Sequence, residues 1–173
     1  AKGTIDKYIG DAIMAFWNAP SSNPKHASDA CISAINSQHK LNKLRFQWAK
    51  DGKPMLYTRI GIHTGNVIIG NIGSDYKMDY TILGDSVNLA SRLEDINKIY
   101  HTDTIISEST YKGAKKDIIT RNLDIVAVKG KKEGVAIHEL IDTYDSKLNN
   151  NWIHIYEDGL SYMQDTQLEK AMS

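Results

Sequence analysis

Two runs of strand-forming residues open the chain, and the hydrophobic pattern then changes to a helical period. Residues 4–17 form two strand-like runs that meet at Gly10-Asp11, a pair that favours a tight hairpin because glycine accepts a positive φ without steric cost. A loop rich in Pro, Ser and Asn follows at 18–24. Small and apolar residues then recur near helical spacing, at Ala27, Ala30, Cys31, Ala34, Leu41, Leu44 and Trp48. The pattern predicts a hairpin followed by one long helix that ends before Asp51.

The next stretch predicts a second hairpin. Residues 57–63 and 67–72 are rich in β-forming side chains. They flank Thr64-Gly65-Asn66, and Gly-Asn is again a hairpin signal. We therefore expect these two strands to pair with each other.

The remaining pattern alternates short strands and helices. Residues 80–83 predict a strand, and Gly84-Asp85-Ser86 then supply N-cap residues for a helix from about 87 to 97. The later elements are a strand near 104–107, a helix near 109–115, and strands near 124–128 and 135–141. The overall pattern is mixed α/β.

A helical segment closes the chain. It starts at Trp152, and Gly159, Tyr162 and Ala171 match three positions of the tetratricopeptide helix pattern. We therefore predict a boundary after residue 143. Residues 144–173 then form a linker and a helical segment, the start of a tetratricopeptide-like repeat and a candidate surface for a protein partner.

Composition and charge limit the classes of function that the chain can have. A chain of 173 residues with 41% hydrophobic side chains can form one compact domain that buries roughly 70% of its unfolded surface. Twenty-one basic and 21 acidic residues balance, so the overall charge favours neither nucleic acid nor an anionic membrane. The longest apolar run, 12–17, is far shorter than the roughly 20 residues of a membrane span. A single cysteine, Cys31, fits a reducing compartment, and the expected location is the cytoplasm, although a longer parent protein could be membrane-anchored.

Three features could carry chemistry. Asp11, at the tip of the first hairpin, could hold a hard cation, although an isolated Gly-Asp is more often a plain turn. Asn88 and Arg92 share one helix face, where an amide could orient a sugar and a guanidinium could meet a phosphate. Taken alone, such a pair is more often solvated surface. The basic turn at 128–132 could reach phosphates. The sequence contains no Walker loop, dinucleotide glycine fingerprint, Ser-His-Asp arrangement or zinc-ligand spacing.

Three longer segments carry a specific resemblance. They are DKYIGDAIMAF at 6–16, RIGIHTG at 59–65 and YTILGDSVNLASRLE at 80–94. In this order and spacing they resemble class III adenylate and guanylate cyclases, especially bacterial ones. The similarity covers about 3–140, and VKGK at 128–131 resembles the late lysine motif of the family.

The resemblance implies a fold and an assembly. It implies a ferredoxin-like α+β catalytic domain over residues 1–143 that dimerises head to tail, with active sites at the subunit interface. In the family two aspartates hold two Mg²⁺ or Mn²⁺ ions, and Asp11 matches the second of them. The first aspartate is expected in a strand before Ala1, so the domain is expected to lack its first strand and helices. Because two-metal catalysis needs both ions, we expect this fragment alone to be inactive or nearly so.

The resemblance also implies roles for other residues. Lys7 matches the base-reading lysine and Thr81 the position that pairs with it. An ammonium and a hydroxyl oxygen suit adenine, because adenine N1 accepts a hydrogen bond and the 6-amino group donates one. In guanine, N1 carries a hydrogen and donates, and the 6-oxygen accepts. Asn88 matches the residue that orients the ribose, and Arg92 the residue that stabilises charge on the α-phosphate.

The late lysine motif completes the expected site. Lys129 resembles the lysine that holds the terminal phosphates, although Lys131 is close enough to exchange with it. The expected function is therefore that of an adenylate cyclase, a phosphorus-oxygen lyase that converts ATP to 3′,5′-cyclic AMP and pyrophosphate in signalling. The alternatives are a guanylate cyclase and a catalytically inactive cyclase-like regulatory module.

Overall fold

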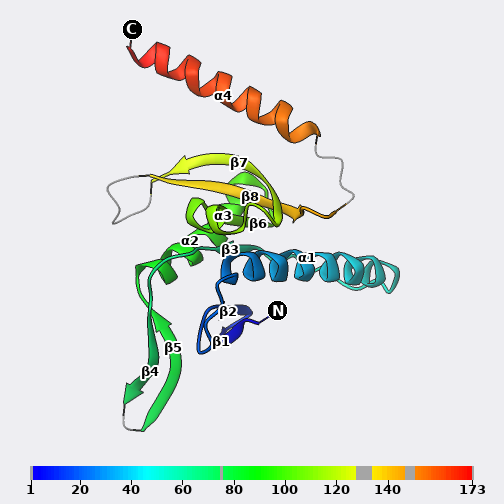
Figure 1. Cartoon of the computed structure of the whole chain (residues 1–173). Helices are drawn as coiled ribbons and strands as arrows, with labels where there is room; N and C mark the ends of the chain where they lie inside the picture. Colours follow the sequence, from blue (N-terminus) through cyan, green and yellow to red (C-terminus); the bar gives the residue numbers. More distant parts are fainter. Residues whose placement is uncertain (1, 75, 128–133, 147–150, 173) are drawn as a thin grey trace.

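A computed structural model of the chain describes residues 2–74, 76–127, 134–146 and 151–172, and the fold is a mixed α+β arrangement (Figure 1). The elements, in chain order, are β1 (Thr4–Ile9), β2 (Ala12–Phe16), α1 (His26–Lys50), β3 (Ile60–Ile62), β4 (Ile68–Ser74), β5 (Lys77–Leu83), α2 (Asp85–Tyr100), β6 (Thr104–Ser107), α3 (Glu108–Ala114), β7 (Ile118–Val126), β8 (Val135–Thr143) and α4 (Asn151–Met172).

The main sheet of the described residues is four-stranded, in the order β3-β6-β8-β7. β3 and β6 run parallel, whereas β8 is antiparallel to both β6 and β7. Successive side chains of β6 face opposite sides of the sheet. Ile106 packs with the buried residues of α1 and α3, and Ile105 packs with Leu89 and Leu93 of α2. The sheet therefore lies between α1 and α3 on one face and α2 on the other.

Helix α2 lies directly against the backbone of β3. A Cβ atom on Gly61 would collide with backbone atoms of Ala90 and Glu94, so a side chain has no room there. Leu93 is completely buried in this contact region. The position of α2 is thus fixed by close packing, and α2 carries two of the predicted site residues.

Two hairpins form separate two-stranded sheets, β1-β2 and β4-β5. The first is the predicted hairpin, and Gly10 in its turn has the positive φ of 62° that favoured glycine there. The second pairs Ile68 with Leu83 and Ser74 with Lys77, and it projects away from the main sheet in Figure 1. The β1-β2 hairpin contacts β5 through the rings of Phe16 and Tyr80, whose centroids lie 6.2 Å apart.

The predicted second hairpin is wrong. β3 ends at Ile62 and pairs in parallel with β6, while β4 pairs with β5. The intervening segment packs against the start of α2 instead of turning back. A Cβ on Gly65 would collide with the side chains of Ser86 and His63, and Ser86 Oγ donates to the Asn66 carbonyl at 3.0 Å. The glycine is needed for this close approach and not for a hairpin turn.

The other helices and strands predicted from the sequence are partly confirmed. The helices predicted near 27–48, 87–97 and 109–115 and the strand at 104–107 are present. The predicted side-chain cap of α2 is wrong: Gly84, with φ 146°, is the N-cap, and no side chain caps the helix. β7 begins at Ile118, earlier than predicted, because its first residues are buried in the core.

The C-terminal helix docks on β7 through its first turns. The guanidinium of Arg121 lies 4.6 Å from the ring centroid of Tyr156 and 5.6 Å from that of Trp152. The Asn122 backbone N–H donates to Glu157 at 3.2 Å. No helix in the described part of the chain is both long and apolar enough to cross a membrane. The domain boundary after 143 and the tetratricopeptide-like character of α4 remain predictions.

Candidate active site

A β-bulge in the first hairpin aims an acidic side chain at β5. Ile5 pairs with Ala15 and Lys7 with Met14, so Asp6 is an extra residue between two regular pairs. Bulges of this kind re-aim side chains and are common next to active sites. The Asp6 side chain is only 1% exposed, although it lies on a two-stranded hairpin.

The carboxylate of Asp6 joins two predicted site residues. Its Oδ2 accepts a hydrogen bond from Thr81 Oγ1 at 2.6 Å and a longer one from the Ile82 backbone N–H at 3.4 Å. Its Oδ1 forms an ion pair with Lys7 Nζ at 3.4 Å. The side chain of Lys7 is 40% exposed. The structure thus brings Lys7 and Thr81 together on one carboxylate, although Asp6 and Thr81 are 75 positions apart.

Asn88 and Arg92 lie one turn apart on α2, which follows β5 directly through Gly84. Asn88 is exposed and Arg92 is half-buried. Helix α2 positions both side chains. The predicted common face is therefore present, and β5 and α2 carry Thr81, Asn88 and Arg92 in one continuous unit.

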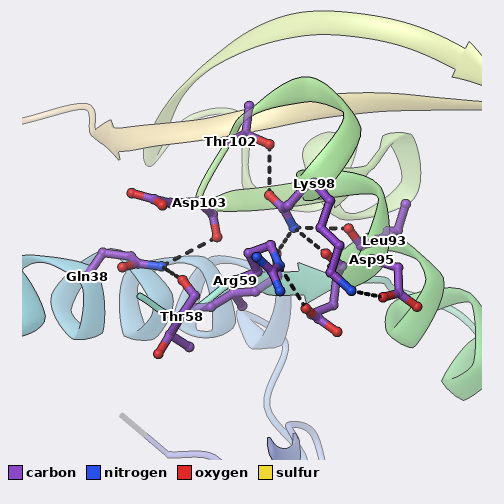
Figure 2. A network of polar contacts seen from close by, with 11 residues as sticks. Gln38, Thr58, Arg59, Leu93, Asp95, Lys98, Thr102 and Asp103 are labelled. Carbon is purple, nitrogen blue, oxygen red and sulfur yellow. Dashed lines mark hydrogen bonds and ion pairs between the residues drawn. The ribbon is translucent and has the colours of Figure 1, made fainter. Parts of the chain in front are cut away.

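A polar network fixes the other end of α2 (Figure 2). Asn97 is 1% exposed, and its amide donates to the Ile60 carbonyl of β3 at 3.0 Å. Its Oδ1 accepts from the Thr102 hydroxyl at 2.8 Å. Nearby, Gln38 of α1 donates to the Thr58 carbonyl at 2.7 Å, which ties the chain before β3 to α1. The site helix is thus braced by hydrogen bonds as well as by packing.

Asp11 lies in the turn of the first hairpin and is exposed. The described residues contain no group of three or more acidic, histidine or cysteine side chains that could hold a metal ion. A single exposed carboxylate nevertheless fits Mg²⁺, which proteins usually bind through one or two carboxylates together with substrate phosphates and water. The role of Asp11 as a metal ligand stays a prediction. The predicted phosphate-binding Lys129 and its neighbour Lys131 lie outside the described residues.

Comparison with known proteins decides the family. The model of the adenylate and guanylate cyclase catalytic domain matches residues 5–142. The chain belongs to the class III adenylate and guanylate cyclase family. It is 36% identical over 139 residues to adenylate cyclase 1 of Rhizobium meliloti, which covers 80% of the chain and 21% of that protein. This cyclase domain therefore spans about a fifth of the length of that relative.

Solved cyclase structures share the fold. The adenylyl cyclase CyaB from P. aeruginosa matches with a TM-score of 0.72 and 37% identity, covering 83% of this chain and 74% of that one. The guanylyl cyclase Cya2 matches with a TM-score of 0.74 and 32% identity, covering 84% of this chain and 73% of that one. The predicted α+β cyclase fold is thus confirmed, and both nucleotide specificities occur among its structural neighbours.

The residue that sequence reasoning missed in this cyclase domain is Asp6. Its only signal is its place directly before Lys7 in a short hairpin strand. Regular alternation would put neighbouring side chains on opposite faces. The bulge changes this arrangement, and a bulge has no clear signature in the pattern of hydrophobic positions.

Proposed function

We propose that this chain is the catalytic part of an adenylate cyclase that converts ATP to 3′,5′-cyclic AMP and pyrophosphate in a signalling role. The observation that carries the proposal is the joint placement of Lys7 and Thr81 on the Asp6 carboxylate. Family membership supports cyclase chemistry, and these two residues support the choice of base.

The base would be recognised by its hydrogen-bonding edge. The Lys7 ammonium has only donors, so it suits N1 of adenine, which accepts. The Thr81 hydroxyl oxygen suits the 6-amino group, which donates. Guanine presents an N–H at N1 and an oxygen at position 6, so an ammonium facing its N1 would be repelled. Sites built to pair such groups discriminate strongly because a mismatched base leaves buried polar groups unpaired.

The chemical step is an intramolecular displacement. The ribose 3′-oxygen forms a bond to the α-phosphorus, the bond from that phosphorus to the pyrophosphate oxygen breaks, and the 3′-hydroxyl proton passes to solvent water. Asn88 would orient the ribose for this attack. Arg92 would donate to the α-phosphate oxygens, where negative charge builds up in the transition state. Lys129 would hold the terminal phosphates.

Divalent ions complete the proposed chemistry. Asp11 would hold Mg²⁺ or Mn²⁺, and two such ions, when bound, favour loss of the 3′-hydroxyl proton and neutralise charge on the departing pyrophosphate. The exposed position of Asp11 in its turn leaves room for phosphate oxygens and water to supply the remaining ligands.

The proposed active unit is a homodimer with its sites at the interface. The first hairpin supports this, because several of its large apolar side chains are more than half exposed. They are Ile5 at 58%, Tyr8 at 69%, Ile9 at 58% and Ile13 at 62%. Exposed apolar patches of this kind mark interaction surfaces. Analytical ultracentrifugation of the full-length protein with nucleotide and metal tests the proposed homodimer. A protein that stays monomeric under these conditions would count against it.

The test of function is a direct product assay. The full-length protein is given ATP or GTP with Mg²⁺ or Mn²⁺, and cyclic nucleotides are identified by mass spectrometry. Cyclic AMP as the main product supports the proposal. Preferential cyclic GMP formation would make the chain a guanylate cyclase, and nucleotide binding without product would make it a regulatory module. The double variant K7E/T81C should lower ATP turnover, and unchanged ATP selectivity in it would remove these residues from base reading.

A further inference from the structure

The Asp6 carboxylate is placed where it controls the hydrogen-bonding character of Thr81. It is almost completely buried, and Thr81 is itself 5% exposed. The 2.6 Å separation of Thr81 Oγ1 and Asp6 Oδ2 is a short hydrogen bond in which the hydroxyl is the donor, because an ionised carboxylate can only accept. The Ile82 N–H, at 3.4 Å, helps to hold the same oxygen in place.

A threonine hydroxyl alone is ambiguous toward purines. It can accept from the 6-amino group of adenine, or it can rotate and donate to the 6-oxygen of guanine or hypoxanthine. A free hydroxyl would therefore discriminate weakly between these bases. Once its proton is committed to Asp6, only its lone pairs remain for the base.

We propose that Asp6 is a specificity-determining positioning residue, which makes the Thr81 hydroxyl an obligate acceptor and thereby directs the site to 6-amino purines. The inference rests on the proposed base-reading role of Thr81. The other oxygen of the same carboxylate forms an ion pair with Lys7 at 3.4 Å, but the proposed effect on selectivity is exerted through the Thr81 hydroxyl.

A purely structural role for Asp6 makes different predictions. Asp6 could simply tether the first hairpin to β5, and its loss would then displace Lys7 together with the hairpin and lower the ATP-to-ITP ratio whether or not the Thr81 hydroxyl is present. Comparison with the Thr81→Val background separates the two roles, because a selectivity effect exerted through the Thr81 hydroxyl disappears when that hydroxyl is absent.

The experiment compares Asp6→Ala, Asp6→Asn, Thr81→Val and the double variant Asp6→Ala/Thr81→Val in the full-length protein. The measured quantity is the ratio of kcat/KM for ATP to that for ITP, which carries a 6-oxygen. Binding of 3′-deoxy-ATP and 3′-deoxy-ITP is measured in parallel, so the ratio can be read even without turnover. Asp124→Ala is the matched control, because it removes a carboxylate that also accepts a 2.6 Å hydrogen bond, from Tyr100, on a different part of the fold.

We expect Asp6→Ala to lower the ATP-to-ITP ratio about tenfold, the effect of one mismatched buried hydrogen bond. Asp6→Asn should keep most of the ratio, because its amide oxygen can still accept the Thr81 proton. In the Thr81→Val background, Asp6→Ala should cause no further loss, since Asp6 acts through that hydroxyl.

Several outcomes would overturn the inference. An unchanged ratio in Asp6→Ala, or additive effects in the double variant, would show that Asp6 does not act through Thr81. If Asp6→Ala does not fold, an Asp6→Asn ratio as low as that of Thr81→Val would lead to the same conclusion. If the wild-type protein prefers GTP, the proposed adenylate cyclase function is refuted. If it binds no nucleotide, both that function and the proposed role of Asp6 are refuted.

Discussion

Removing the Asn97 amide should loosen the helix that carries the proposed catalytic pair. Its Nδ2 donates to the carbonyls of Ile60 at 3.0 Å, Leu93 at 3.0 Å and Glu94 at 3.1 Å. Its Oδ1 accepts from the buried Thr102 hydroxyl at 2.8 Å. The bond to Ile60 joins α2 to β3, and the bond to Thr102 joins α2 to the segment that directly follows the helix; both belong to the polar network of Figure 2. Asn97→Ala removes all of them.

The expected loss follows from the two bonds that leave the helix. The hydrogen bond to Ile60 contributes about 1 kcal/mol net, and loss of the acceptor for the buried Thr102 hydroxyl costs roughly 1–3 kcal/mol. The Leu93 and Glu94 carbonyls belong to the same helix as Asn97, so their loss adds less. We therefore expect Asn97→Ala to lower the free energy of unfolding by about 3 kcal/mol. For a domain of this size this corresponds to a fall in Tm of roughly 6–12 °C.

Thermal and urea unfolding measure this change. Lys98→Ala is the matched control on the same helix, because it removes an exposed ion pair with Asp95. Such pairs contribute about 0–1 kcal/mol, so the control should change stability little. The urea midpoint of Asn97→Ala should fall with an unchanged slope. A loss no larger than that of Lys98→Ala would show that the Asn97 network does not brace α2.

Three further predictions concern single side chains. Burial raises the pKa of Cys31 to about 12, so a thiol reagent at pH 8 should modify it slowly in the native chain and rapidly in urea, and fast native labelling would contradict the packing. Burial and the hydrogen bond to Asp124 raise the pKa of Tyr100 to about 12. Its contribution to stability is therefore complete below pH 10 and is lost as the pH rises toward 12, and Asp124→Asn should move a phenolate absorbance transition to lower pH. Arg92→Ala in the full-length protein should lower kcat about a thousandfold or more with little change in KM, whereas a raised KM alone would make Arg92 a ground-state binding residue.

Local sequence patterns predicted elements well where neighbouring residues determine the structure. The first hairpin follows from Gly10 in its turn, and α1 follows from small residues at helical spacing. The pairing of β3 could not be predicted in the same way. β-propensity identifies a strand but not its partner, and Ile60–Ile62 pairs in parallel with a strand more than 40 residues away. Parallel pairing needs a long crossover, so no local turn signal can indicate it.

In the candidate site, too, the local sequence identifies the residues, whereas the tertiary structure determines how they interact. The motif identified Lys7 and Thr81, but the character of a threonine hydroxyl depends on which atom takes its proton. That atom belongs to Asp6, which reaches Thr81 through a bulge in one hairpin and the packing of that hairpin against another. The sequence contains every residue of this arrangement, whereas the direction of the hydrogen bond arises only when β1 and β5 meet. Base selectivity would then be a property of the contact between the two hairpins, and substitutions that shift this contact should change selectivity even when Lys7 and Thr81 are retained.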